Sequence, residues 1–121
     1  MPQIFTTSFR RYRPEMGTAV VTSLGLPKWL PEAQSWPRCW VITPTPTLFH
    51  LADDDEFARL YVERLDRFGA QKISRALQRI AVEHQAGKLV LLCHESDWDS
   101  CHRKLFAAWL MEATGELCRE M

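Results

Sequence analysis

The chain has 121 residues, 46% of them hydrophobic, which predicts one domain with a single core over residues 1–121. Its 15 basic and 15 acidic residues give no net charge. This balance argues against duplex nucleic acid as a partner, because proteins that bind it are normally basic, whereas a small-molecule or anionic ligand is not excluded.

Location is predicted from the absence of long apolar segments. No run approaches the length of a membrane span, and the N-terminus lacks the apolar region of a signal peptide. We therefore expect a cytoplasmic protein that does not enter membranes. Its four cysteines are expected to be reduced thiols rather than a disulfide framework.

The first half of the chain predicts three short strands separated by irregular segments. Residues 3–9, 18–24 and 39–43 are rich in β-branched and aromatic side chains, which is typical of strands. Residues 25–38 contain three prolines, which predict a long loop. A loop of this length is uncommon in a small domain and favours a functional role.

Two groups of side chains in these loops have two interpretations each. Three arginines at positions 10, 11 and 13 surround Tyr12 and could contact phosphate, but the balanced charge favours a solvated loop. Trp29 and Trp36 could stack on a ring ligand, but tryptophans more often cover the edge of a core. We favour the second interpretation in both cases.

The second half predicts three helices and two strands. Residues 53–68 form a helix capped by Asp53 and ended by Gly69, and residues 71–86 form another that Gly87 ends. The acids at 53–55 are typical of a helix start rather than a metal site. A strand over 89–94, a helix over 101–114 and a short edge strand over 116–120 follow. The first of these helices has one apolar face, made of Phe57, Leu60, Tyr61, Leu65 and Phe68. In the second, the residues predicted to face inward are Ile73, Leu77, Ile80 and Ala81, and the third has Leu105, Ala108, Trp109 and Glu112 spaced along it.

The segment 88–103, KLVLLCHESDWDSCHR, is the most informative part of the sequence. Its continuous apolar run predicts an interior strand buried on both faces, followed by a loop and a helix start. In open α/β folds, sites lie at the carboxyl ends of strands. We therefore predict an α/β single-domain three-layer fold, with a mostly parallel sheet of about four to five strands flanked by helices.

The motif LLCHE-x5-CHR-x5-WL over residues 91–110 resembles the signature of the DUF488 family. Members of that family carry a strand ending in Leu-Leu-Cys-(Tyr/His/Ala)-Glu and a helix opening with Cys-His-Arg. Residues 4–9, 20–27 and 116–120 are similar to other parts of the family pattern, while His94 stands where an aromatic or small residue is commoner. The resemblance implies an α/β fold and a site at this motif, but it names no substrate.

Three chemical hypotheses fit the motif, and the first is thiol chemistry. Cys101 falls in the first turn of a predicted helix, where the dipole and Arg103 would favour the thiolate. Cys93 comes from the neighbouring strand end, so the two sulfurs are predicted to lie close together. His94 or His102 would carry the proton. Such a protein would be a small-molecule or nucleotide-related enzyme.

The second hypothesis is a zinc site of Cys93, His94, Cys101 and His102. The spacing matches no common zinc motif, and adjacent strand residues point to opposite faces, so we expect neither a bound metal nor a cofactor. The third hypothesis is a pocket in which Arg103, Glu95 and His94 hold an anionic ligand. The alternative to all three is a non-catalytic structural or interaction module whose Cys-His-Arg motif only fixes the strand–helix turn.

Overall fold

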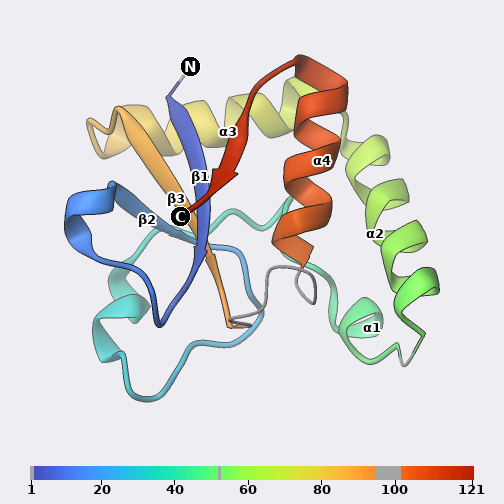
Figure 1. The fold of residues 1–121 in the computed structure, drawn as a ribbon, viewed down its shortest axis with the longest axis horizontal. Helices are drawn as coiled ribbons and strands as arrows, with labels where there is room; N and C mark the ends of the chain where they lie inside the picture. Colours follow the sequence, from blue (N-terminus) through green and yellow to red (C-terminus); the bar gives the residue numbers. More distant parts are fainter. Residues whose placement is uncertain (1, 52, 95–101) are drawn as a thin grey trace.

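The computed structural model describes residues 2–51, 53–94 and 102–121 (Figure 1). The elements in chain order are β1 (Gln3–Ser8), the 3₁₀ helix η1 (Pro14–Met16), β2 (Thr18–Val21), the 3₁₀ helix η2 (Pro31–Ser35), α1 (Pro46–Phe49), α2 (Asp54–Phe68), α3 (Ala70–Glu83), β3 (Lys88–Cys93), α4 (His102–Thr114) and β4 (Cys118–Glu120). Within these ranges, no helix is long and apolar enough to cross a membrane.

The described strands form one parallel sheet in the order β2-β3-β1-β4. Leu89 of β3 aligns with Ile4 of β1 on one side and with Thr18 of β2 on the other. The five residues from Leu89 to Cys93 are fully buried. The predicted α/β class and the interior position of β3 are therefore confirmed, and β4 is an edge strand as predicted.

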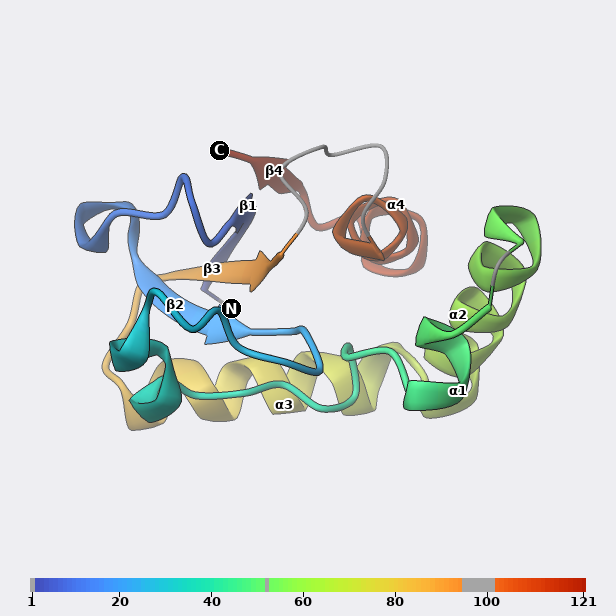
Figure 2. The ribbon, with the colours of Figure 1, turned by 90° about the horizontal axis from the view of Figure 1, so that it is seen from below.

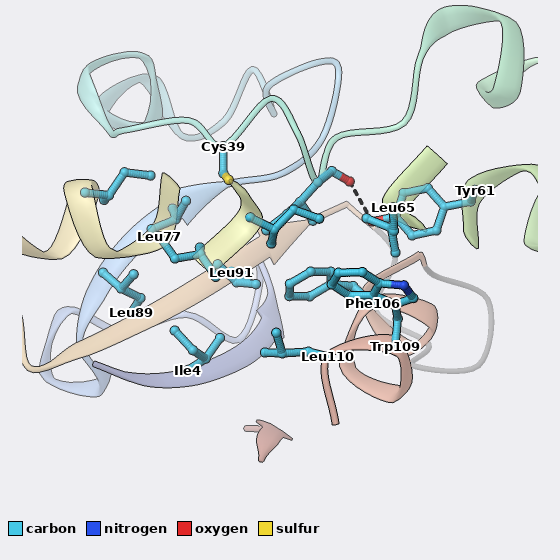
Figure 3. Packing of buried hydrophobic residues seen from close by; sticks show 14 of the residues in the cluster. Ile4, Cys39, Tyr61, Leu65, Leu77, Leu89, Leu91, Phe106, Trp109 and Leu110 are labelled. Carbon is cyan, nitrogen blue, oxygen red and sulfur yellow. Dashed lines mark hydrogen bonds between the residues drawn. The ribbon is translucent and has the colours of Figure 1, made fainter. Parts of the chain in front are cut away.

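The helices pack on one face of the sheet. Ile4, Leu89 and Leu91 meet apolar side chains of α2, α3 and α4 there, including Leu77 and Phe106 (Figure 3). The helix α2 lies outside α4, farthest from the strands in both views (Figures 1 and 2). Successive side chains of a strand point to opposite faces of the sheet, so Cys93 lies on the same face as Leu89 and Leu91.

The opposite face is covered by 3₁₀ helices and loops instead of α-helices. Val90 and Leu92 lie in a second cluster, against which Tyr12, Leu30 and Trp36 pack. Trp36 therefore covers the core as predicted, with its ring edge-on to Tyr12. Trp29 does not, because it is 56% exposed.

The predicted strand over 39–43 is wrong. A single parallel bridge joins Val21 to Arg38, and the chain then turns away from the sheet. The backbone N–H of Thr43 donates to the Cys39 carbonyl, and so does the Thr43 hydroxyl at 2.9 Å. The Tyr61 hydroxyl donates to the Ile42 carbonyl at 2.6 Å. Backbone N–H and C=O groups that a strand would use for pairing are therefore hydrogen-bonded within a turn and to Tyr61.

The helix ends follow the predictions with one exception. Asp53 caps α2 by accepting from the backbone of Asp55 and Glu56. The helix α3 ends before Gly87, at Glu83, and Gln85 takes the positive φ of 50°. The buried residues of α4 are His102, Arg103, Phe106, Ala107, Trp109 and Leu110.

Gly17 offers a test of how closely the backbone before β2 approaches β3. A Cβ at this position would lie 2.9 Å from the Lys88 Cβ and 3.0 Å from its carbonyl oxygen, and φ is +141°. We expect Gly17→Ala to lower the free energy of unfolding by about 1–3 kcal/mol, measured by urea denaturation. Gly87→Ala is the control, because nothing lies within 4 Å of its added Cβ. An equal effect of both substitutions would contradict the close approach.

Candidate functional site

Buried polar side chains gather where the strands end. They are Thr6, Thr7, Ser8, Thr22, Ser23, Thr43, His102 and Arg103. Ser8 and Cys93 are direct neighbours in the β1–β3 register. The backbone N–H and the hydroxyl of Thr22 both donate to the Leu92 carbonyl, at 3.0 Å and 2.9 Å. Since all strands run the same way, their carboxyl ends meet at this one edge, as the sequence predicted.

Cys93 is the last residue of β3 and is fully buried on the helical face. It is disulfide-bonded, whereas Cys39 and Cys118 are free. The expectation of four reduced thiols is therefore wrong for Cys93. Its predicted partner Cys101 lies outside the described residues, and so does Glu95. The predicted closeness of the two sulfurs accordingly stays a prediction.

Arg103 places a positive charge at the Cys93 sulfur. Its Nη1 donates to Cys93 Sγ at 2.9 Å, and its side chain is 1% exposed. The sequence reasoning used Arg103 to favour a thiolate at Cys101, whereas the structure gives it a contact with Cys93. A guanidinium at this distance favours the thiolate over the thiol.

Glu120 holds this guanidinium in place from the edge strand β4. Arg103 Nε donates to both Glu120 oxygens, at 3.0 Å and 3.2 Å, and Nη2 donates to Oε2 at 2.9 Å. Glu120 also accepts from the Thr6 hydroxyl at 2.7 Å, and Arg11 approaches it at 3.7 Å. This bidentate pair fixes the direction of the guanidinium, and its Nε–Nη2 side is occupied by a carboxylate of the chain itself.

His102 lies beside this pair with little exposure to solvent. Its ring is 8% exposed and meets the Tyr61 ring edge-on, with centroids 5.7 Å apart. Burial is the main cause that lowers the pKa of His102 to about 4. The Arg103 charge also lowers this pKa, while a hydrogen bond with the Thr22 backbone raises it. The imidazole is therefore neutral near pH 7, and its burial disfavours protonation.

His94 leaves the strand on the other side. It is exposed, its Nε2 lies 2.9 Å from the Gly25 carbonyl oxygen, and its ring is 5.2 Å from that of Phe9. This divergence from Cys93 is the geometry on which we argued against a shared zinc site. The part of the chain that is described contains no cluster of three or more potential metal ligands. Whether the protein binds metal stays a matter of prediction.

Sequence reasoning missed Thr6, Ser8, Thr22 and Glu120. The run Thr6-Thr7-Ser8 was a usable signal, because hydroxyl residues at the end of a buried strand need partners at the sheet edge. Glu120 gave no local signal. Its partner is 17 residues away in sequence, and only the parallel pairing of β4 with β1 brings it to the edge.

The family comparison covers most of this region. A family model described as "Domain of unknown function DUF488" matches residues 35–110, which include α2, α3, β3 and the motif around Cys93. No curated protein and no solved structure matches the chain. The resemblance drawn from the Cys-His-Arg motif is thus confirmed at the level of the family.

The buried His102 predicts a dependence of stability on pH. The native pKa of His102 is about 4 against an ordinary 6.5, so between these values the unfolded chain takes up a proton that the native chain refuses. The free energy of unfolding should fall as the pH drops through this window, by up to roughly 3 kcal/mol.

Urea denaturation across this window, compared between wild type and His102→Gln, measures the effect. The variant should lose the contribution of His102, while the exposed His84→Gln should keep it. Parallel pH profiles for wild type and His102→Gln would show that His102 is not buried as a neutral ring.

Proposed function

The chain belongs to the DUF488 family, a domain of unknown function, and we propose that it is a thiol-dependent enzyme that reduces disulfide substrates. Cys101 is the attacking thiol in this proposal, and the buried Cys93 is the resolving thiol. The observation that carries the proposal is the state of Cys93, which is disulfide-bonded and has the Arg103 guanidinium 2.9 Å from its sulfur.

The charge around Cys93 supports a sulfur that cycles between two redox states. A thiolate at this position would accept a charge-assisted hydrogen bond from Arg103, whereas a disulfide sulfur is only a weak acceptor. Stabilising the reduced form makes the protein disulfide easier for a thiol reductant to reopen, which favours turnover, although it lowers the driving force for reducing the substrate. A purely structural disulfide gains nothing from a buried cation at its sulfur.

The proposed reaction is two successive thiol–disulfide exchanges. The Cys101 thiolate attacks one sulfur of the substrate disulfide, forms a mixed disulfide and releases the first substrate thiolate. The Cys93 thiolate then attacks the Cys101 sulfur and releases the second. The substrate gains two electrons and two protons, and the protein is left with one disulfide, which a thiol reductant of the glutathione class returns to the dithiol.

The remaining predicted site residues have supporting roles in the proposal. His102 follows Cys101 in sequence, and its neutral imidazole would orient the Cys101 thiol rather than take its proton, because burial lowers the pKa of His102 to about 4. His94 is exposed at the same edge and, with Glu95, would contact the substrate. Arg103, which sequence reasoning assigned to anion binding, would instead hold Cys93 through its hydrogen bond, because its charge is already paired with Glu120. A cytoplasmic location, with residues 1–121 as a single domain, completes the proposal, because thiol reductants keep that compartment reducing.

A second candidate is a structural or interaction module. The observation that favours it is the almost complete burial of Arg103 in its pair with Glu120, which links α4 to β4. In this case the motif would only fix the turn between β3 and α4. The two candidates differ in what they predict for the thiols, so substitutions at the cysteines separate them.

The decisive assay follows the reduction of hydroxyethyl disulfide and of glutathione disulfide by the pre-reduced protein. Cys101→Ser should lose activity, and Cys93→Ser should accumulate a mixed disulfide with the substrate, detected by intact mass. Cys118→Ser is the matched control, because burial raises the pKa of that thiol to about 12 and keeps it unreactive. Equal activity in wild type and in both motif variants would leave the structural module as the function.

The charges around Cys93 predict opposite shifts of its reduction potential. Arg103→Gln removes the cation and should lower the potential by about 30–60 mV, the equivalent of one charged hydrogen bond. Glu120→Gln removes the opposing carboxylate and should raise it. Equilibration with glutathione buffers, read by thiol labelling, gives both values. A merely structural pair would lower stability in both variants without moving the two potentials in opposite directions.

A further inference from the structure

A hollow of about 460 Å³ lies between residues 35–41 and the second half of α3. Its walls include Arg38, Cys39 and Trp40 on one side and Arg79, Ile80 and His84 on the other. The volume is within the range of small-molecule sites, about 300–1,000 Å³. None of these residues belongs to the proposed redox site, so the two can be tested separately.

Trp40 is presented to solvent by fixed neighbours. The residue is 57% exposed, and the Arg38 guanidinium carbon lies 4.6 Å from the centre of its ring. Arg38 itself donates to the carbonyls of Ser23 and Leu24, at 3.2 Å and 3.4 Å. Arg64 donates to the Trp40 carbonyl at 3.2 Å. A large aromatic ring held outside the core in this way offers a stacking surface for another ring.

The opposite wall supplies positive charge. Arg79 on α3 and His84 just after it are exposed, and within the described part of the chain no carboxylate pairs with Arg79. Glu83 is the acidic residue of the lining. Cys39 and Ile80 are buried residues of the lining, and burial raises the pKa of the Cys39 thiol to about 11 and so keeps it neutral.

We infer that this hollow binds a planar aromatic ring carrying an anionic group, either a phosphate or a carboxylate. The ring stacks against Trp40, and the anion pairs with Arg79, whose guanidinium suits both oxyanions. Arg38 lies over the Trp40 ring and adds positive charge to the same wall. The ligand class follows from a flat stacking surface and a free guanidinium on facing walls of one cavity.

The test is isothermal titration with adenosine monophosphate and with 2-naphthoate, which represent the two sources of the anion. Adenosine and inorganic phosphate are the partial ligands. We expect saturable binding of at least one complete ligand, and at least about tenfold weaker binding of its uncharged ring or lone anion. No saturable binding of either complete ligand, or equal affinity for adenosine and its monophosphate, would overturn the inference.

The variants locate the site. Trp40→Leu and Arg79→Gln should each weaken binding by about tenfold or more. Trp29→Leu is the matched control, since Trp29 is 56% exposed and also lies under an arginine, Arg10 at 5.8 Å, but does not line the hollow. Both tryptophans are exposed, so the substitutions should leave the fold intact, which circular dichroism checks. Loss of binding in Trp29→Leu with retention in Trp40→Leu would contradict the assignment.

Discussion

The pairing of Arg103 with Glu120 is the interaction on which the carboxyl edge of the sheet depends. Burying a guanidinium costs several kcal/mol unless its hydrogen bonds are met, and here Glu120 and the Cys93 sulfur meet them. Through this group α4, β4 and β3 are held together, while the Thr6 hydroxyl connects the carboxylate to β1. A three-residue edge strand such as β4 needs such a tie, because its backbone pairs on one side only.

The same pair determines what Cys93 can do. A fixed cation at 2.9 Å lowers the cost of a buried thiolate, while the Glu120 carboxylate on the far side of the guanidinium reduces that effect. Structural and chemical roles are therefore not separate properties of Arg103. The hydrogen bonds that anchor the strand also hold the charge in one direction, and a charge oriented before the reaction needs no rearrangement when the thiolate forms.

The parts of the fold that were predictable have local causes. The apolar run of β3, the Asp53 cap and the spacing of Tyr61 and Leu65 act over a few residues and are legible in sequence. The strand over 39–43 failed because the long-range bond from Tyr61 competes with sheet pairing. The buried face of α4 includes His102 and Arg103, which are polar yet point inward because their partners lie on other elements. Cys93 was predictable as a site residue because it belongs to a local sequence motif. Glu120 was not, because its partner Arg103 lies on another element.

The first part of the chain carries an excess of basic residues, although the net charge of the whole chain is zero. Residues 1–51 contain five basic and two acidic side chains, so the excess of acidic residues lies in the rest of the chain. Part of this segment covers the face of the sheet opposite the α-helices, and residues 35–41 reach α3. Two of its arginines lie over exposed tryptophans, Arg10 over Trp29 and Arg38 over Trp40. A neutral protein can therefore still present anion-attracting aromatic surfaces, and Trp40 combines such a surface with a cavity.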